Sequence, residues 1–327
     1  GDLTLSMLQG EAGNQARELE ELIGWLRDRE RPDAVCLSNA LLIGLAHRLK
    51  QAVGVPVVCM LQGEDSFLDA LPATHRAAAW RLIAQQATAV DRFVAPTRYF
   101  AERMGERLNL ASSRVRIVPN GIALDGFAPA LTPPEPPVLG YFARMCPEKG
   151  LGGLVEAFEI LKTRDRIKRL KLRVGGGLGP ADEPFVASLR QRLRAGGLAD
   201  QAEFCPNLDR AAKLAFLRSV SVFSVPALYG EAFGLYVIEA LASGVPIVQP
   251  RHAAFPELVE ATGGGLLCAP GDARALAESI EGLLLEPARA RALGDAGRRA
   301  VLEEFSAEAM ARGMAQVFQE LVGGQGA

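Results

Sequence analysis

The stretch Tyr229-Gly230-Glu231-Ala232-Phe233-Gly234-Leu235-Tyr236-Val237-Ile238-Glu239-Ala240-Leu241-Ala242-Ser243-Gly244-Val245-Pro246 decides how the rest of this chain is interpreted. It follows an apolar run that is typical of a buried strand. Leu235, Ile238 and Leu241 recur at helical spacing, and the Ser-Gly-Val-Pro ending is a helix stop. Gly234 therefore stands at a strand-to-helix turn, where free backbone N–H groups and the helix dipole favour an anion.

Two glutamates stand on either side of this turn. Glu231 precedes the helix, and Glu239 lies about one and a half turns inside it. A pair of glutamates at this spacing occurs by chance in many helices, but the Phe-Gly between them and the Ser-Gly-Val-Pro exit make the whole stretch specific. The stretch resembles the Glu-x7-Glu signature of retaining GT-B glycosyltransferases, in particular glycosyltransferase family 4.

The resemblance implies that this stretch binds a nucleotide sugar. It places Glu239 on the ribose hydroxyls, and Glu231, as the catalytic carboxylate, beside the transferred sugar. Backbone N–H groups of Phe233, Gly234 and Leu235 are implied to hold the distal phosphate and the sugar. A surface helix with two solvated glutamates is the alternative interpretation.

A second element carries two cations. Arg144 and Lys149 follow an apolar strand-like run and stand five residues apart, before a glycine. The element is similar to the family's Gly-x3-Arg-x4-Lys-Gly sequence, which implies that both cations bind the diphosphate of the donor. Paired cations can stabilise the charge that grows on a departing nucleoside diphosphate without a metal ion. Two solvated surface cations are the alternative.

The first half of the chain departs from the family at one position. The family usually has a His-Gly pair after the strand predicted at 57–61, whereas this chain has Gln62-Gly63. Glutamine can donate and accept hydrogen bonds but cannot titrate. We therefore predict that Gln62 and Asp65 position the sugar at the catalytic site, without a base of the histidine type. This departure leaves the identity of the donor sugar open.

Other motifs are less specific. The run Val174 to Pro180 looks like a dinucleotide-binding loop, but proline replaces its third glycine, which argues against NAD. The Pro119-Asn120-Gly121 sequence predicts a turn. The cationic run from Lys162 to Arg173 is best interpreted as a solvated helix end and loop, with contact to anionic lipid headgroups as the alternative.

The bulk properties exclude several classes of protein. The chain has 327 residues, 49% of them hydrophobic, which is enough for two domains with cores of their own. Its formal net charge of -2 gives no basic field for nucleic acid. The cysteines and histidines are scattered, and no Asp-x-Asp element is present, so we predict reduced thiols, no metal and no cofactor. No apolar run is long enough to span a membrane, and the chain is interpreted as cytoplasmic, with the inner face of the membrane as a further location.

Strands alternate with amphipathic helices along the chain, which predicts parallel sheets covered on both faces. The fold class is therefore α/β with GT-B architecture: two doubly wound Rossmann-like domains that face a cleft. We place an acceptor domain at 1–128, a Pro-rich linker at 129–137, a nucleotide-sugar-binding domain at 138–305 and a terminal helix at 306–327. The resemblance implies that this helix crosses back to the first domain.

The start of the chain is unusual. It opens with Gly1-Asp2 and no methionine, and continues into a run at 3–7 that predicts a strand. The family has further strands before this point. We therefore interpret the first domain as incomplete at its amino terminus.

The resemblance implies a retaining, metal-independent glycosyltransferase. It would move a hexosyl unit from a nucleoside diphosphate sugar, with UDP favoured over GDP and ADP, to a hydroxyl of a glycan, a lipid-linked molecule or a small molecule. Two alternatives stay open: a GT-B sugar-nucleotide epimerase, and a non-catalytic scaffold that binds a nucleotide or a partner.

Overall fold

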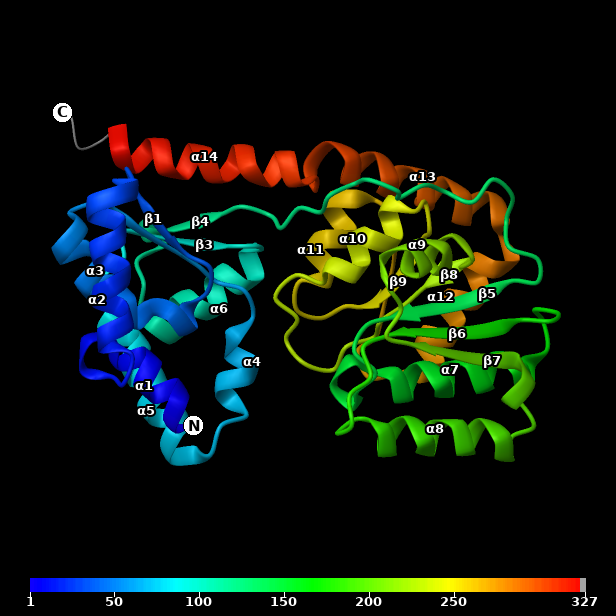
Figure 1. Cartoon of the computed structure of the whole chain (residues 1–327). Coiled ribbons are helices and arrows are strands. Elements are labelled where there is room, and N and C mark those ends of the chain that lie inside the picture. Colours follow the sequence, from blue (N-terminus) through cyan, green and yellow to red (C-terminus); the bar gives the residue numbers. More distant parts are fainter. Residues whose placement is uncertain (324–327) are drawn as a thin grey trace. The chain divides into compact units, whose positions relative to one another are not determined.

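The computed structural model describes residues 1–323 and divides the chain into two compact units (Figure 1). The first unit contains residues 1–120 and the carboxy-terminal helix from Glu308 onward, and the second contains residues 121–307. Each unit is built on a parallel sheet of its own. The predicted α/β class is confirmed.

The sheet of the first unit runs in the order β1-β2-β3-β4. Its short strands are parallel, and helices lie around them (Figure 1). The inner strands β2 and β3 are mostly buried, whereas the outer strands β1 and β4 are partly exposed. The strands are β1 (Val35–Leu37), β2 (Val57–Met60), β3 (Arg92–Ala95) and β4 (Val115–Ile117). The helices are α1 (Asp2–Gln9), α2 (Ala16–Trp25), α3 (Ala46–Val53), α4 (Glu64–Asp69), α5 (Ala73–Gln86), α6 (Arg98–Leu108) and α14 (Ala307–Gly323).

The start of the chain differs from its predicted structure. The strand predicted at 3–7 is wrong, because these residues belong to helix α1. Leu8 is fully buried, and the helix packs closely on Gly44, where an added Cβ would come within 2.2 Å of the Met7 carbonyl oxygen. A short apolar run fits a helix or a strand equally well by pattern, so its packing partner decides.

Helix α14 belongs to the first unit although it follows the second unit in sequence. Val317 of this helix is buried in an apolar cluster with Val58 of β2, Val94 of β3 and Val118 after β4. The burial of one helix face against three neighbouring segments of the sheet region stabilises this arrangement.

The sheet of the second unit runs in the order β10-β9-β8-β5-β6-β7, and its strands are parallel. Helices α10, α11 and α13 lie on one side of it, and α7 and α8 lie on the other (Figure 1). The strands are β5 (Val138–Phe142), β6 (Lys171–Gly176), β7 (Ala202–Pro206), β8 (Val222–Phe223), β9 (Ile247–Pro250) and β10 (Gly265–Cys268). The helices are α7 (Leu151–Arg164), α8 (Glu183–Ala195), α9 (Arg210–Arg218), α10 (Leu235–Ala242), α11 (Phe255–Thr262), α12 (Ala273–Leu285) and α13 (Pro287–Glu304).

Residues 121–128 belong to the second unit, whereas the sequence analysis placed them at the end of the first domain. The N–H group of Ile122 donates to the carbonyl oxygen of Phe305 at 2.9 Å. The Phe127 ring is buried in the core of the second unit. The segment predicted as a linker, 129–137, also falls within this unit.

Candidate active site

The loops after β5, β6, β7 and β8 meet at one edge of the second sheet, because parallel strands end on the same side. Asn207, after β7, joins two of them: its Oδ1 accepts from the Leu178 N–H at 2.9 Å, and its Nδ2 donates to the Leu178 carbonyl at 3.1 Å. Gly176 has φ 123°, and a Cβ there would lie 1.9 Å from the Ala143 carbonyl oxygen. The glycine-rich turn therefore lets these loops pack backbone against backbone.

The loop after β5 carries Lys149, and the loop after β8 fixes its position. The N–H of Leu228 donates to the Glu148 carbonyl at 2.9 Å. Gly150 has φ 75°, and a Cβ there would come 1.8 Å from the Pro226 carbonyl oxygen. Only glycine fits this close approach, so the Lys-Gly pair is needed to bring the two loops together.

The two loops bring Lys149 and Glu231 into direct contact. The Lys149 Nζ lies 2.5 Å from Glu231 Oε2, and both side chains are mostly buried. The same oxygen accepts hydrogen bonds from the hydroxyls of Tyr229 at 2.8 Å and Tyr236 at 2.7 Å. Lys149 Nζ also lies 4.9 and 5.0 Å from the centres of the two tyrosine rings. The structure thus joins a cation and a carboxylate that the sequence analysis had assigned to separate tasks.

The sequence analysis did not select Tyr229 or Tyr236 as site residues. Burial, followed by the nearby Glu231 charge, raises the pKa of Tyr229 and the pKa of Tyr236 well above the ordinary tyrosine value. Each hydroxyl therefore stays protonated and donates a hydrogen bond to the Glu231 carboxylate. Both residues stand in the signature stretch, but nothing in its periodicity shows that their hydroxyls meet on one oxygen.

Arg144 occupies a different environment from Lys149. Its guanidinium is largely exposed, with Nε 3.4 Å from Asp182 Oδ2 and Nη2 3.6 Å from Glu148 Oε2. The Tyr141 hydroxyl donates to the Arg144 carbonyl at 2.7 Å and anchors the backbone. The guanidinium can therefore reorient toward an anion while its backbone stays fixed.

Glu239 is paired with a lysine that the sequence analysis did not select. Lys213 of α9 places its Nζ 2.5 Å from Glu239 Oε1, and the two side chains are 22% and 17% exposed. The helix positions Glu239 by ordinary α-helical geometry, and the partner comes from the element that follows β7. No local motif connects these two residues.

The residues of the predicted phosphate turn have distinct environments. Phe233 is buried, with its ring centre 6.1 Å from that of Phe305. Gly234 begins α10 with φ 94°, a conformation that favours glycine. Leu235 is 46% exposed. The N–H groups of the first turn of a helix have no partner within that helix, so this turn can offer donors to an anion.

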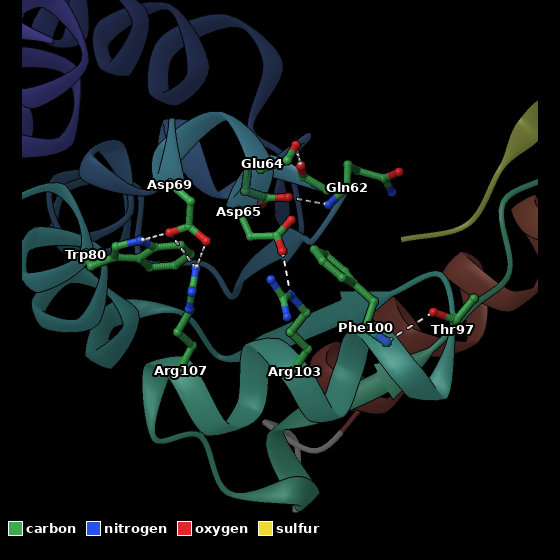
Figure 2. A network of polar contacts seen from close by, with 11 residues as sticks. Gln62, Glu64, Asp65, Asp69, Trp80, Thr97, Phe100, Arg103 and Arg107 are labelled. Atoms are coloured by element: carbon green, nitrogen blue, oxygen red, sulfur yellow. Dashed lines mark hydrogen bonds and ion pairs between the residues drawn. The ribbon is translucent and has the colours of Figure 1, made fainter. Parts of the chain in front are cut away.

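In the first unit, a polar network surrounds the turn from β2 to α4 (Figure 2). The side-chain amides of Gln62 and Asn120 form a hydrogen bond, in which Asn120 Nδ2 donates to Gln62 Oε1 at 3.0 Å. Glu64 is buried and accepts from the N–H groups of Ala40 at 2.7 Å and Gln62 at 2.6 Å. Burial raises the pKa of Glu64, although these backbone donors oppose the effect.

Asp65 is enclosed rather than open to a substrate. Its residue is 2% exposed, and its Oδ2 accepts from Arg103 Nε of α6 at 2.6 Å (Figure 2). Its Oδ1 is buried and has no hydrogen-bond partner within residues 1–323. In this conformation the carboxylate holds Arg103 and does not reach solvent. Contact between Asp65 and a sugar stays a prediction.

Metal ions and membranes were considered as further partners in the sequence analysis, and the structure bears on both. Within residues 1–323, no three His, Cys, Asp or Glu side chains gather as they would around a metal ion. In the same residues, no helix combines the length and apolar character needed to cross a membrane. Within the same residues, four arginines of the cationic run form ion pairs: Arg164 with Glu278, Arg166 with Glu281, Arg169 with Glu135 and Arg173 with Glu203.

The type of fold follows from comparison with solved structures. The structure of Anabaena Alr3699/HepE in complex with UDP matches with a TM-score of 0.80 and 17% identity, over 95% of this chain and 84% of that chain. The fold is therefore the GT-B glycosyltransferase fold, as predicted.

The family follows from the sequence comparisons. Residues 127–300 match the family Glycosyl transferases group 1, and residues 8–121 match the Glycosyl transferase 4-like domain. The chain belongs to the glycosyl transferases group 1 family, which confirms the resemblance stated above.

Two curated relatives are similar over parts of their length. The phosphatidyl-myo-inositol mannosyltransferase of Mycobacterium leprae is 32% identical over 52% of this chain and 44% of its own length. The D-inositol 3-phosphate glycosyltransferase 2 of Catenulispora acidiphila is 32% identical over 80% of this chain and 59% of its own length. The chain thus spans about half the length of these relatives.

Proposed function

We propose that this chain is a retaining glycosyltransferase that moves a hexosyl unit from a nucleoside diphosphate sugar to an acceptor hydroxyl. The observation that carries the proposal is the contact of Lys149 with Glu231 at the carboxyl edge of the second sheet. The Lys149 ammonium can stabilise an anionic leaving group, and the Glu231 carboxylate can stabilise a sugar that becomes positively charged. The family and the names of the relatives, a mannosyltransferase and a glycosyltransferase, support the same activity.

Donor binding uses the charges at this edge. Lys149 has three ammonium protons, so it can keep Glu231 and still donate to a phosphate oxygen. Arg144 turns from Asp182 and Glu148 to the diphosphate, and the N–H groups at the α10 N-terminus donate to the distal phosphate. The donor is a UDP-sugar, and no metal or cofactor takes part. The fold neighbour solved with UDP supports this choice of base.

Transfer proceeds with attack on the face from which the leaving group departs. The bond from the anomeric carbon to the phosphate oxygen breaks, and its electron pair goes to the nucleoside diphosphate. The acceptor oxygen then bonds to the same carbon, and its proton passes to the departing phosphate oxygen. Glu231, fixed by Tyr229 and Tyr236, stabilises the oxocarbenium-like state. Gln62 positions the sugar, and Asp65 supports it indirectly by tying α4 to Arg103. The acceptor is a glycan, a lipid-linked molecule or a small molecule.

A donor panel tests the proposal. The chain is incubated with UDP-, GDP- and ADP-sugars, with and without simple glycoside acceptors, and release of nucleoside diphosphate is measured. We expect release from a UDP-sugar, and a loss of release in Glu231→Gln without a matching loss of UDP affinity, because the charge acts mainly in the transition state. Binding of nucleotide without any turnover would instead describe a scaffold, and sugar isomerisation without release would describe an epimerase.

A further inference from the structure

We infer that Lys213 is a positioning residue for ribose recognition: it holds Glu239 so that the donor site prefers ribonucleotides to 2′-deoxyribonucleotides. The inference rests on the proposed donor site and adds a residue to it. Its basis is the 2.5 Å contact between Lys213 Nζ and Glu239 Oε1, between two side chains that are both largely shielded from water.

The pairing leaves specific hydrogen-bonding capacity on both residues. Lys213 occupies Oε1 of Glu239, and within residues 1–323 the second oxygen, Oε2, has no hydrogen-bond partner. The ammonium keeps two further protons. The free Oε2 can accept a hydrogen bond from a ribose hydroxyl, while Lys213 holds the carboxylate in place through Oε1.

The environment of Lys213 favours a fixed position over a mobile surface charge. Its helix, α9, begins at the N-cap Asp209, whose side chain accepts from the Ala212 N–H at 2.8 Å. The Lys213 ammonium lies 5.8 Å from the centre of the Phe142 ring at the end of β5. That ring packs edge to face against Phe216 of the same helix, with 5.3 Å between ring centres. The lysine is thus held between the carboxyl end of β5 and the signature helix.

Without Lys213, the partly buried Glu239 carboxylate loses its counter-ion and its fixed orientation. The bond from Oε2 to the ribose hydroxyls then weakens. The site would discriminate poorly between nucleotides with and without the 2′-hydroxyl. The loss of one positive charge would by itself weaken the binding of both nucleotides equally. The ratio of the affinities for the nucleotide with and without the 2′-hydroxyl therefore isolates the positioning effect.

The test measures binding of UDP and of 2′-deoxy-UDP by calorimetry, which needs no acceptor. We expect the parent chain to prefer UDP by roughly 10- to 100-fold, the range for one hydrogen bond to a charged group. In Lys213→Met this ratio should fall at least about 3-fold, because Glu239 loses its orientation. Lys213→Arg, which keeps the cation, should retain most of the ratio. The double variant Lys213→Met, Glu239→Gln should not lower the ratio below that of Glu239→Gln alone.

A matched control is Lys168→Met, which removes an exposed lysine that pairs with Asp165 away from this edge. The ratio of UDP affinity to 2′-deoxy-UDP affinity in this variant should equal that of the parent chain. Thermal melting checks that each variant folds, and Lys213→Gln replaces the methionine variant if the latter does not. An equal loss of both affinities in Lys213→Met, or a parent chain that binds both nucleotides alike, overturns the inference and leaves the proposed function intact. A parent chain that binds no UDP, GDP or ADP overturns both.

Discussion

One oxygen of Glu231 accepts hydrogen bonds from Lys149, Tyr229 and Tyr236. Within residues 1–323, the other oxygen has no hydrogen-bond partner. Three donors on one oxygen fix the direction in which the second oxygen points. A charge that must act on a developing cation is most effective when its position is set beforehand. At the scale of single residues, the tyrosines therefore belong to the proposed catalytic arrangement and are more than core residues.

Tyr236→Phe tests this arrangement. The substitution keeps the buried ring and removes one hydrogen bond to a charged group. We expect kcat for nucleoside diphosphate release to fall roughly 10- to 100-fold, while UDP affinity changes little. Kinetics and calorimetry measure the two quantities. Thr262→Val is the control, since it removes another buried hydroxyl, bonded to the Leu258 carbonyl, and should lower the melting temperature without changing kcat. An unchanged kcat in Tyr236→Phe would show that the hydroxyl only fills space.

At the scale of elements, short turns with buried polar groups connect strands to helices. Glu64 opens α4 and binds the N–H groups of Ala40 and Gln62, so it ties the end of β2 to the 40–45 segment. Asp65 ties the same helix to Arg103 of α6. These carboxylates therefore hold the loop that carries Gln62, and they affect the predicted sugar contact through it.

The buried Glu64 should make stability depend on pH. Burial raises its folded-state pKa above the ordinary value of 4.5, so the folded chain binds this proton more tightly than the unfolded chain does. Its contribution to the free energy of unfolding is then full below the unfolded pKa and is lost as pH rises through the folded pKa. The free energy of unfolding of the parent chain, relative to Glu64→Gln, should therefore fall as pH rises above the ordinary carboxyl pKa of 4.5. Urea unfolding at several pH values measures it, and a difference that is constant with pH would contradict the assignment.

At the scale of the whole molecule, the chain passes from the first unit to the second after Asn120 and returns at Glu308. The first unit is therefore completed by a helix from the far end of the sequence. Val317 supplies apolar area to the cluster with Val58, Val94 and Val118. The stability of the first unit thus depends on residues that follow the second unit in the sequence.

Val317→Ala should destabilise the first unit. Loss of two buried methyl groups costs about 1–2 kcal/mol, including the cavity left behind. Hydrogen exchange should show lower protection of β2, β3 and β4, with β5 and β6 unchanged, because each unit has a core of its own. Val322→Ala on the same helix is the control, since Val322 is 40% exposed. Equal loss of protection in both sheets would mean that the units unfold together.

Much of the fold could be predicted from local patterns. Apolar strands, amphipathic helices and the glycines at turns are encoded in contiguous residues, and the signature from Tyr229 to Pro246 was sufficient to identify the family. The run at 3–7 could not be assigned in this way, because a short apolar segment takes the form that its packing partner allows. The boundary at Asn120 was also missed, because the burial of Phe127 in the second core is not a local property.

The sequence by itself determined the α/β class, the family, and Arg144, Lys149, Glu231 and Glu239 as the charged residues of the proposed donor site. Only the tertiary structure decided how these charges pair. Lys149 and Glu231 are 82 residues apart, and Lys213 and Glu239 are 26 apart, so neither contact leaves a trace in any local spacing. Such contacts form when the loops after separate parallel strands are brought to one edge of a sheet, and that edge exists only once the strands have assembled.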